Sequence, residues 1–388
     1  MSGVDPSAAV AKQTKLAAEI FDELYNKTFD GVGVTRASYG EGEQVASELL
    51  ESHAKKLGLV IDHDAAGNIY MTMRGESQEA PPIVIGSHID SVAQGGNFDG
   101  AAGVISGLIA CAGIIEKGIR LPQDIRVMGI RAEESAWFGV SYIGSRSALG
   151  TLPKDALDNA KRSDTGITLG EHMFKAGCNP DALRAGNIYL PPSSLKAYLE
   201  VHIEQGPVLD SKDLPLGIVT GIRGNRRLPS AQCIGEYSHC GGVPRSYRKD
   251  AVLAVTDLIS YLDKIWDECE RKGEDFAFTV GKFFTDKEWH AMTKISGAVE
   301  FSLDMRSLDG DFIESMTKRV CEEALKIEKQ RGVQFNLGDF TRAAPGPMDD
   351  HIKTRMLSGA NSLGIPYMEI PSGASHDAAA FAAAGVPT

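Results

Sequence analysis

The sequence has 388 residues, which is too long for one ordinary hydrophobic core, so we expect two domains. Hydrophobic residues make up 43% and charged residues 24%, proportions that are typical of a soluble globular protein and exclude a disordered or fibrous chain. The formal charge of -12 argues against nucleic acid as the main partner, and the basic cluster Arg223–Arg227 is too short to change that.

The sequence also argues against a membrane span and a disulfide framework. Its longest apolar stretches, near Val104–Ile115 and Pro81–Ile85, are shorter than the ~18 apolar residues that a spanning helix needs. Residues 1–24 lack the basic start and apolar run of a secretory signal, so we expect a cytoplasmic protein. The six cysteines show no CxxC spacing, which predicts reduced thiols and neither a zinc ribbon nor disulfide bonds.

The first half of the chain alternates between helix and strand patterns. A helix is expected from Glu43 to Leu57 with Gly58 as its stop, and a hairpin follows at 61–75 with its turn at Gly67–Asn68. The remaining expected elements are strands at 83–90, 124–134 and 195–206 and a helix of small residues at 100–118. This alternation indicates an α/β sheet.

The pattern changes after about Gly221. The expected elements are a strand at Ala231–Glu236, a helix with the stripe Val252, Val255, Ile259, Leu262 and Trp266, strands at Phe276–Phe284 and Val299–Met305, a helix with Phe312, Ile313, Met316 and Val320, and a strand at Val333–Leu337. Their order, βαββαβ, is that of a ferredoxin-like split βαβ unit inserted into the first domain. We therefore expect one domain at 1–218 and 339–388 and the inserted domain at 219–338.

Histidines and acids gather where strands of the first domain are expected to end. The segments are GSHID at 86–90, NFDGA at 97–101, RAEES at 131–135, EVHIEQG at 200–206 and SGASHDA at 372–378. Open α/β sheets place their ligand sites at this edge, so we expect these segments to meet there.

Two pairs of residues in these segments suit the metal-assisted hydrolysis of an amide. Such a reaction needs a polarised carbonyl, an activated water and a proton carrier, and two metal ions bridged by a carboxylate supply the first two. In the pair His88 and Asp90, the acid can orient a metal-binding imidazole. Of the adjacent acids Glu133 and Glu134, one can bind metal while the other, partly desolvated, acts as the base.

Each of these features is weak evidence when taken alone. A lone histidine at a strand end is more often structural or solvated, and Asp99–Gly100 is a common turn sequence. The pair Glu133–Glu134 would by itself more often be a solvated strand end. Only the combination of the segments favours a metal site.

Together the segments resemble motifs of the M20 metallopeptidase superfamily, specifically of its hydantoinase/carbamoylase-type amidases. The matching stretches are GSHIDSVAQGGNFDGAAGV, AEESAWFGVSYIGSRSALG, EVHIEQGPVLD and SGASHDA, in the family's order. The resemblance implies an α/β catalytic domain of the zinc-exopeptidase type and an inserted dimerisation and lid domain. It also implies two divalent metal ions per chain, and the ligand types accept Zn, Mn, Co or Ni.

The resemblance implies a role for each residue of the metal site. Asp99 bridges the two ions, His88 and His202 bind one of them, Glu134 and His376 bind the other, Glu133 is the catalytic base, and Asp90 supports catalysis beside His88. The histidine of the HIEQG motif, here His202, is typical of the carbamoylase branch, where many peptidase members have an acid.

Substrate contacts are implied for four residues. Gln205 is similar to a family residue that contacts substrate, and His239 in HCGGVPRSYRKDA resembles the histidine of HAGTTPMxxRxDA that helps polarise the substrate carbonyl. Arg306 resembles an arginine that clamps a substrate carboxylate, the alternative being a surface strand arginine. Thr293 stands in place of a substrate-binding asparagine, and Cys240-Gly241-Gly242-Val243 replaces Ala-Gly-Thr-Thr, so the substrate pocket departs from the family standard.

We therefore expect a dinuclear-metal amidohydrolase that cleaves a linear ureido, N-carbamoyl or N-acyl bond of a small carboxylate-bearing substrate, such as an N-carbamoyl-L-amino acid or allantoate. The alternatives are an aminoacylase or dipeptidase of the same superfamily, against which His202 counts, and an inactive metal-binding paralogue. The expected partners are a small-molecule substrate and a second copy of the chain, bound through the inserted domain, without nucleic acid or membrane. Relatives usually continue beyond the position of Thr388, so we expect a trimmed or partly ordered C-terminus.

Overall fold

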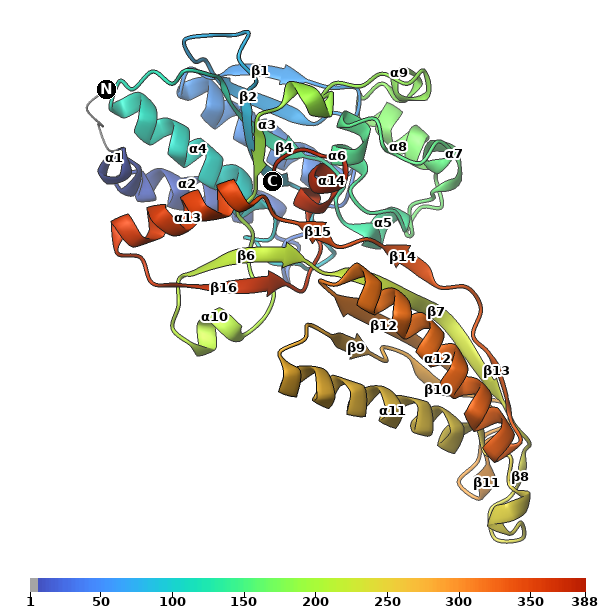
Figure 1. Ribbon diagram of the computed structural model, residues 1–388. Helices are drawn as coiled ribbons and strands as arrows, with labels where there is room; N and C mark the ends of the chain where they lie inside the picture. The colour runs from blue at the N-terminus through green and yellow to red at the C-terminus, as the bar shows by residue number, and fades with distance from the viewer. Residues whose placement is uncertain (1–5) are drawn as a thin grey trace. The chain divides into compact units, whose positions relative to one another are not determined.

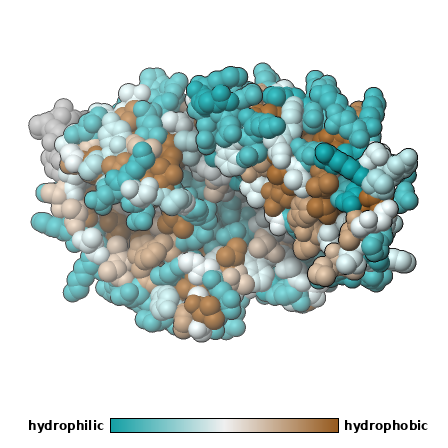
Figure 2. All heavy atoms as spheres, turned by 90° about the horizontal axis from the view of Figure 1, so that it is seen from below, coloured by the Kyte–Doolittle hydropathy of each residue, from teal (hydrophilic) through white to brown (hydrophobic). Residues whose placement is uncertain are grey.

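The computed structural model describes residues 6–388, which form two compact units (Figure 1). Unit 1 comprises the described residues up to Ile218 together with Met348–Met368 and Ala374–Thr388, and unit 2 comprises Val219–Pro347 and Glu369–Gly373. Residues 1–5, the start of the segment 1–24 in which the sequence shows no secretory-signal pattern, lie outside this range. None of the helices among residues 6–388 combines the length and the apolar character that a membrane crossing requires. On the face shown in Figure 2, hydrophobic residues form small groups between hydrophilic ones.

A five-stranded sheet in the order β1-β2-β4-β3-β5 forms the centre of unit 1. Its strands are β1 (Val60–His63), β2 (Ile69–Met73), β3 (Ile83–His88), β4 (Ile125–Ile130) and β5 (Ala197–Leu199). Strand β3 runs parallel to both β4 and β5, whereas the β1–β2 hairpin pairs with β4 in antiparallel fashion. The carboxyl ends of three neighbouring strands therefore lie at one edge of the sheet, as the α/β pattern predicts.

Three helices of unit 1, α2 (Thr14–Thr28), α3 (Glu41–Lys56) and α4 (Ala101–Glu116), share one hydrophobic core with the sheet. The small residues of α4 let this helix approach the strands closely. A Cβ on Gly107 would lie 2.9 Å from Val127, and one on Gly103 would lie 2.5 Å from Cβ of Ser87. This close approach explains the run of small residues in the expected helix at 100–118.

A second hydrophobic cluster of unit 1 is built by helices that the sequence patterns do not predict. They are α5 (Ser135–Phe138), α6 (Ile143–Ala148), α7 (Ala156–Asn159), α8 (Leu169–Lys175) and α9 (Pro180–Arg184). Each has seven residues or fewer, which is too short to show two turns of hydrophobic periodicity. The unit also contains α1 (Ser7–Ala11), η1 (Pro192–Ser194), α10 (Val208–Ser211), α13 (Asp350–Leu363) and α14 (Asp377–Ala383).

Unit 2 is an antiparallel sheet with two long helices on one face. The central strands β7 (Gly224–Ile234) and β12 (Ala298–Ser307) pair along most of their length. At the sides, β9 (Ala277–Thr279) and β10 (Phe283–Thr285) pair with β12, while β13 (Gln334–Asn336) and β14 (Thr341–Ala343) pair with β7. Helices α11 (Ala251–Lys272) and α12 (Gly310–Arg331) share one core with these strands.

Smaller elements complete the described chain. Strands β8 (Ser238–His239) and β11 (Lys294–Ile295) form a two-stranded ladder in unit 2, which also contains η2 (Arg245–Tyr247). A three-stranded sheet has the order β15-β6-β16, with β6 at Leu216–Ile222, β15 at Gly346–Pro347 and β16 at Tyr367–Ser372. The limits of the two units at residues 218 and 368 fall inside β6 and β16.

Several expected strands differ in extent from the observed ones: the strand expected at 124–134 ends at Ile130, and the one expected at Ala231–Glu236 begins at Gly224. The strand expected at 195–206 is limited to β5, because only Ile83–Ile85 of β3 pair with it. The strand expected at Phe276–Phe284 is divided into β9 and β10. Between β9 and β10 the backbone N–H of Ser302 in β12 donates to the carbonyl oxygen of Lys282, while the N–H of Lys282 donates to the side chain of Ser302. One of the two bonds at this point therefore uses a side chain in place of the backbone, where the two short strands are separated.

The stacking of Tyr198 on Phe381 fastens the C-terminal helix α14 to strand β5. The ring centroids are 3.7 Å apart, the planes differ by 5°, and both side chains are buried. We expect Phe381→Ala to lower the free energy of unfolding by about 3–5 kcal/mol, because it removes a large buried ring and leaves a cavity. Leu363→Ala, at a half-exposed position of α13, should change it by less than about 0.5 kcal/mol. Denaturant titration of both variants checks this, and equal losses would contradict it.

Candidate metal centre

The predicted metal-site residues all lie in unit 1, at ends of its strands and helices. His88 is the last residue of β3, and Asp99 lies two residues before α4. Glu133 and Glu134 follow β4, while His202 follows β5 and His376 directly precedes α14. The parallel strands β3, β4 and β5 thus bring three of the segments, which carry His88, the Glu133–Glu134 pair and His202, to one edge of the sheet.

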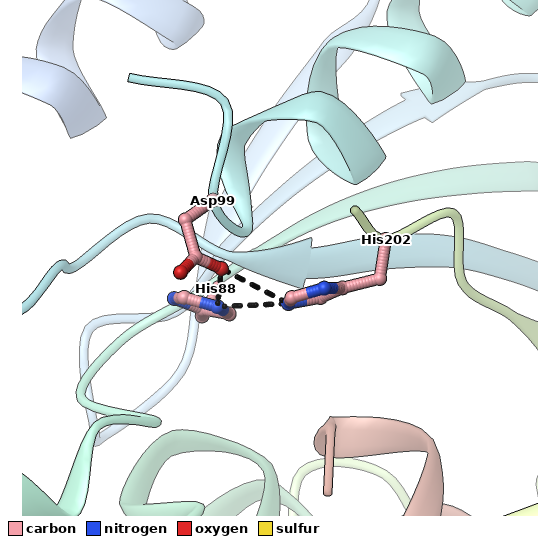
Figure 3. A group of neighbouring side chains, drawn as sticks. All are labelled: His88, Asp99 and His202. Atoms are coloured by element: carbon pink, nitrogen blue, oxygen red, sulfur yellow. Dashed lines mark hydrogen bonds and ion pairs between the residues drawn. The ribbon is translucent and has the colours of Figure 1, made fainter. Parts of the chain in front are cut away.

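His88, Asp99 and His202 form one group of candidate metal ligands (Figure 3). The Nε2 atoms of the two histidines are 3.2 Å apart, and Oδ1 of Asp99 lies 3.5 Å from that of His88 and 3.3 Å from that of His202. Oδ1 of Asp99 is buried and has no hydrogen-bond partner. Ligands held at roughly 2.0–2.2 Å from a tetrahedral metal are separated from one another by roughly 3.3–3.6 Å. The three atoms therefore fit a shared divalent metal ion.

The outer nitrogens of both imidazoles are held by backbone carbonyls. Nδ1 of His88 lies 3.0 Å from the carbonyl oxygen of Asp90, and Nδ1 of His202 lies 3.0 Å from that of Ile203. A carbonyl only accepts hydrogen bonds, so each Nδ1 carries the proton. In the neutral form of each imidazole, Nε2 is then the unprotonated nitrogen that faces Asp99, and this is the tautomer in which a histidine binds a metal ion.

Asp90 fixes the two glutamates by their backbone. Its Oδ1 accepts the N–H of Glu133 at 3.0 Å and its Oδ2 accepts the N–H of Glu134 at 3.2 Å, while Ser38 donates to Oδ2 at 2.6 Å. Oδ1 of Asp90 also lies 3.4 Å from Nδ1 of His88, which is farther than the 3.0 Å between this nitrogen and the carbonyl oxygen of Asp90. In the structure Asp90 therefore orients the Glu133–Glu134 pair as well as facing His88.

The two glutamates differ in burial and in pKa. Glu133 is 8% exposed, and loss of hydration raises the pKa of its carboxyl well above the usual value despite the nearby His88. Partial burial raises the pKa of Glu134 to about 7. The expected desolvation of Glu133 is confirmed, and a raised pKa suits a group that must accept a proton near neutral pH.

A second group of candidate ligands consists of His88, Glu133 and Glu134. Neither of the two groups found among residues 6–388 includes His376. The ring of His376 packs against that of His202, with centroids 4.0 Å apart, and burial together with the charges of His202 and His88 holds its pKa well below the usual value. A histidine that stays neutral is suited to bind a metal ion.

Gln205 contacts the metal group directly. Its Nε2 donates to Oδ2 of Asp99 at 2.8 Å, and its backbone has a positive φ of 54°. With one oxygen bound by Gln205 and the other facing two imidazoles, the Asp99 carboxylate is fixed in direction. Burial raises the pKa of Asp99, but the contact with His88, the charges of His88 and His202 and the bond from Gln205 together lower it to about 2.

Four residues to which the sequence analysis assigns no function hold the backbone around the site: Arg36, Glu43, Arg131 and Ala132. Arg36 is fully buried and donates to the carbonyl oxygens of Ile89 and Asp99, at 2.8 and 3.1 Å. Glu43 accepts hydrogen bonds from Arg131 and from the N–H of Ala132, at 2.7 and 2.8 Å. Ala132 is buried with a φ of 55°, a conformation that non-glycine residues rarely adopt.

The signals for these residues in the sequence are faint. Glu43 stands on the buried side of α3, where a charged residue needs a partner, but nothing in the sequence identifies Arg131 as that partner. Arg36 lies outside every motif and in no helix or strand.

The predicted substrate-binding residues of unit 2 are placed as follows. Nδ1 of His239 accepts hydrogen bonds from the N–H groups of Gly241 and Gly242, at 3.2 and 3.1 Å, which puts its proton on Nε2. The carbonyl oxygen of Thr293 accepts the N–H of Cys240 at 3.0 Å. The guanidinium of Arg306 donates to the carboxylate of Asp304 at 2.8 Å and to the carbonyl oxygen of Gly373 at 2.6 Å.

The protein is therefore an α/β protein with a cluster of candidate metal ligands at the ends of its parallel strands. Residues 84–388 match the family model described as peptidase family M20/M25/M40, so the chain belongs to that family. This family is metal-dependent, and the confirmed resemblance extends to its hydantoinase/carbamoylase-type amidases.

Similar proteins include amidohydrolases and an amidase of known structure. The N-carbamoyl-L-amino acid amidohydrolase of Geobacillus stearothermophilus is 36% identical over 345 residues, covering 89% of this chain and 82% of that protein. The allantoate amidohydrolase of Bacillus subtilis is 29% identical, covering 91% and 83%. A hydantoinase/carbamoylase family amidase from Burkholderia ambifaria superposes with a TM-score of 0.83 at 29% identity, covering 96% of this chain and 88% of that one.

Gly100 is the position where the backbone most tightly constrains the metal group. Its φ is 63°, and a Cβ there would lie 2.5 Å from the ring of His88. We expect Gly100→Ala to displace His88 and to lower the metal content of the purified protein severalfold. Gly96→Ala is the matched control, because a Cβ at Gly96 would meet no atom within 4 Å. Elemental analysis of both proteins decides the matter, and full metal content in the Gly100→Ala protein would contradict the prediction.

Proposed function

We propose that this protein is a metal-dependent amidohydrolase that cleaves a linear ureido, N-carbamoyl or N-acyl C–N bond in a small substrate bearing a carboxylate. The observation that carries the proposal is the convergence of two Nε2 atoms and one buried Asp99 oxygen beside the desolvated Glu133. The similarity to amidohydrolases of N-carbamoyl-L-amino acids and of allantoate supports the ureido substrate class.

We assign the metal ligands as the resemblance implies. His88, His202 and Asp99 would hold one divalent ion, and Asp99, Glu134 and His376 would hold a second. Zn, Mn, Co and Ni all accept such nitrogen and oxygen ligands. When bound, the ions polarise the substrate carbonyl and lower the pKa of a water molecule.

Glu133 has the main proton-transfer role in this reaction. Its carboxylate accepts a proton from the attacking water and then gives it to the leaving nitrogen, so that the C–N bond breaks without releasing an amide anion. The raised pKa of Glu133 favours holding that proton between the two events. Asp90 fixes the backbone of Glu133, which keeps the base in place while it changes charge.

The substrate roles of unit 2 follow from the same resemblance. His239, with its proton on Nε2, would donate a hydrogen bond to the substrate carbonyl as negative charge develops on the oxygen. Arg306 would bind the carboxylate, and Thr293 with Cys240-Gly241-Gly242-Val243 would adapt the pocket to a particular substrate. Gln205 would contact the substrate from beside Asp99. The homodimer and the cytoplasmic location remain predictions.

Removal of the base carboxylate is the first test of this mechanism. Glu133→Gln should keep its metal and lose turnover by about 100- to 10,000-fold, because the amide has the same shape but cannot accept the proton. Glu79→Gln, at an exposed position, makes the same chemical change and should keep wild-type turnover. Steady-state kinetics with elemental analysis checks both; near-normal turnover of the Glu133→Gln protein would remove Glu133 from the mechanism.

Metal removal and a substrate panel test the function itself. Chelation should abolish ammonia release from N-carbamoyl amino acids or allantoate, and added Zn²⁺, Mn²⁺, Co²⁺ or Ni²⁺ should restore it. The panel also contains N-acetyl amino acids and dipeptides. Hydrolysis of these alone, with every ureido compound inert, would instead support an aminoacylase or dipeptidase, and inertness of the metal-loaded protein toward the whole panel would support an inactive paralogue.

A further inference from the structure

The carboxylate of Glu200 joins three segments that each carry a histidine of the metal site. Its Oε1 accepts a hydrogen bond from Oγ of Ser87 at 2.7 Å, and its Oε2 accepts the backbone N–H of Ala378 at 2.7 Å. Ser87 directly precedes His88 in β3. Ala378 lies two residues after His376, and Glu200 itself lies two residues before His202.

We propose that Glu200 is a positioning residue that holds the segments of His88, His202 and His376 together so that their imidazoles converge on the metal ions. The inference rests on the proposed metal-dependent function and assigns a role to a residue outside both groups of candidate ligands.

The connections of β5 and α14 show why this carboxylate is needed. Strand β5 pairs with β3 only over Ile83–Ile85, so no ladder bond to β3 fixes the chain beyond Leu199. The Glu200–Ser87 bond restores a link between the two segments just where the ladder ends. His202, two residues after Glu200, is thereby held beside His88.

The second bond of Glu200 fixes the start of α14. His376 occupies the N-cap position, but its side chain caps no helix N–H, so the first turn lacks the usual local acceptor. Glu200, the residue that follows β5, supplies an acceptor instead. On the other side, Ser145 of α6 donates to Oδ1 of Asp377 at 2.5 Å, so this turn is held from two directions.

Cobalt binding to the chelator-treated full-length protein tests the proposal. Co²⁺ is titrated into wild type and Glu200→Ala, and its visible absorption reports both affinity and coordination geometry. Loss of an outer partner of metal ligands weakens metal binding by about 10- to 100-fold. We expect a loss of this size for Glu200→Ala, with a changed spectrum. Glu200→Gln should restore most of the affinity, because its amide oxygen can accept from Ala378 while its NH₂ donates to Ser87.

Two further variants separate positioning from general stability. Asp124→Ala removes a buried carboxylate that accepts hydrogen bonds from Arg74 and from the N–H of Gly75, at the opposite end of β4. It should lower the thermal midpoint of the metal-free protein while leaving cobalt affinity and spectrum unchanged. Ser87→Ala removes only one bond of Glu200 and should weaken cobalt binding less than Glu200→Ala, which keeps the test open if Glu200→Ala fails to fold.

The outcomes distinguish the positioning role from the proposed function. Wild-type cobalt affinity and spectrum in Glu200→Ala, or in Ser87→Ala should Glu200→Ala not fold, would overturn the positioning role and leave the proposed function standing. Failure of the wild-type protein to bind Co²⁺ would overturn both.

Discussion

The metal site depends on buried carboxylates that hold backbone N–H groups. Three consecutive amides after β4, those of Ala132, Glu133 and Glu134, are each bound by a carboxylate oxygen of Glu43 or Asp90. A charged acceptor makes such bonds roughly twice as strong as neutral ones, which matters because Ala132 adopts a left-handed conformation that costs about 1–3 kcal/mol. The position of Glu133 is therefore set by the protein before substrate arrives.

Arg36 places a buried positive charge among the carboxylates of the metal site. Asp90, Asp99 and Glu134 all contribute to keeping this buried guanidinium charged, although burial lowers its pKa to about 10. Its two hydrogen bonds go to carbonyl oxygens at either end of the loop from Ile89 to Asp99. Arg36 thus fixes that loop and offsets part of the negative charge that the carboxylates bring together.

Chemistry was easier to predict from the sequence than geometry. The strands expected at 83–90 and 124–134 and the helix expected at 100–118 are confirmed as β3, β4 and α4, because each has an apolar pattern, although the strands end at His88 and Ile130, before the polar residues that follow them. The supporting contacts could not be predicted: Glu43 and Arg131 are 88 residues apart, and only the folded chain pairs them. The short helices between Ser135 and Arg184 carry too few turns to show a period.

The stacking of Tyr198 on Phe381 has a consequence for how the chain folds during synthesis. Unit 2 is interposed between the two residues, and 381 − 198 = 183 residues separate them. At translation rates of about 5–20 residues per second, Tyr198 leaves the ribosome's peptidyl centre roughly 10–40 seconds before its partner is made. All of unit 2 is synthesised within that interval, so unit 2 can fold first while the edge of β5 still lacks its covering helix. Unit 1 therefore stays without this stacked pair of rings until unit 2 has been made.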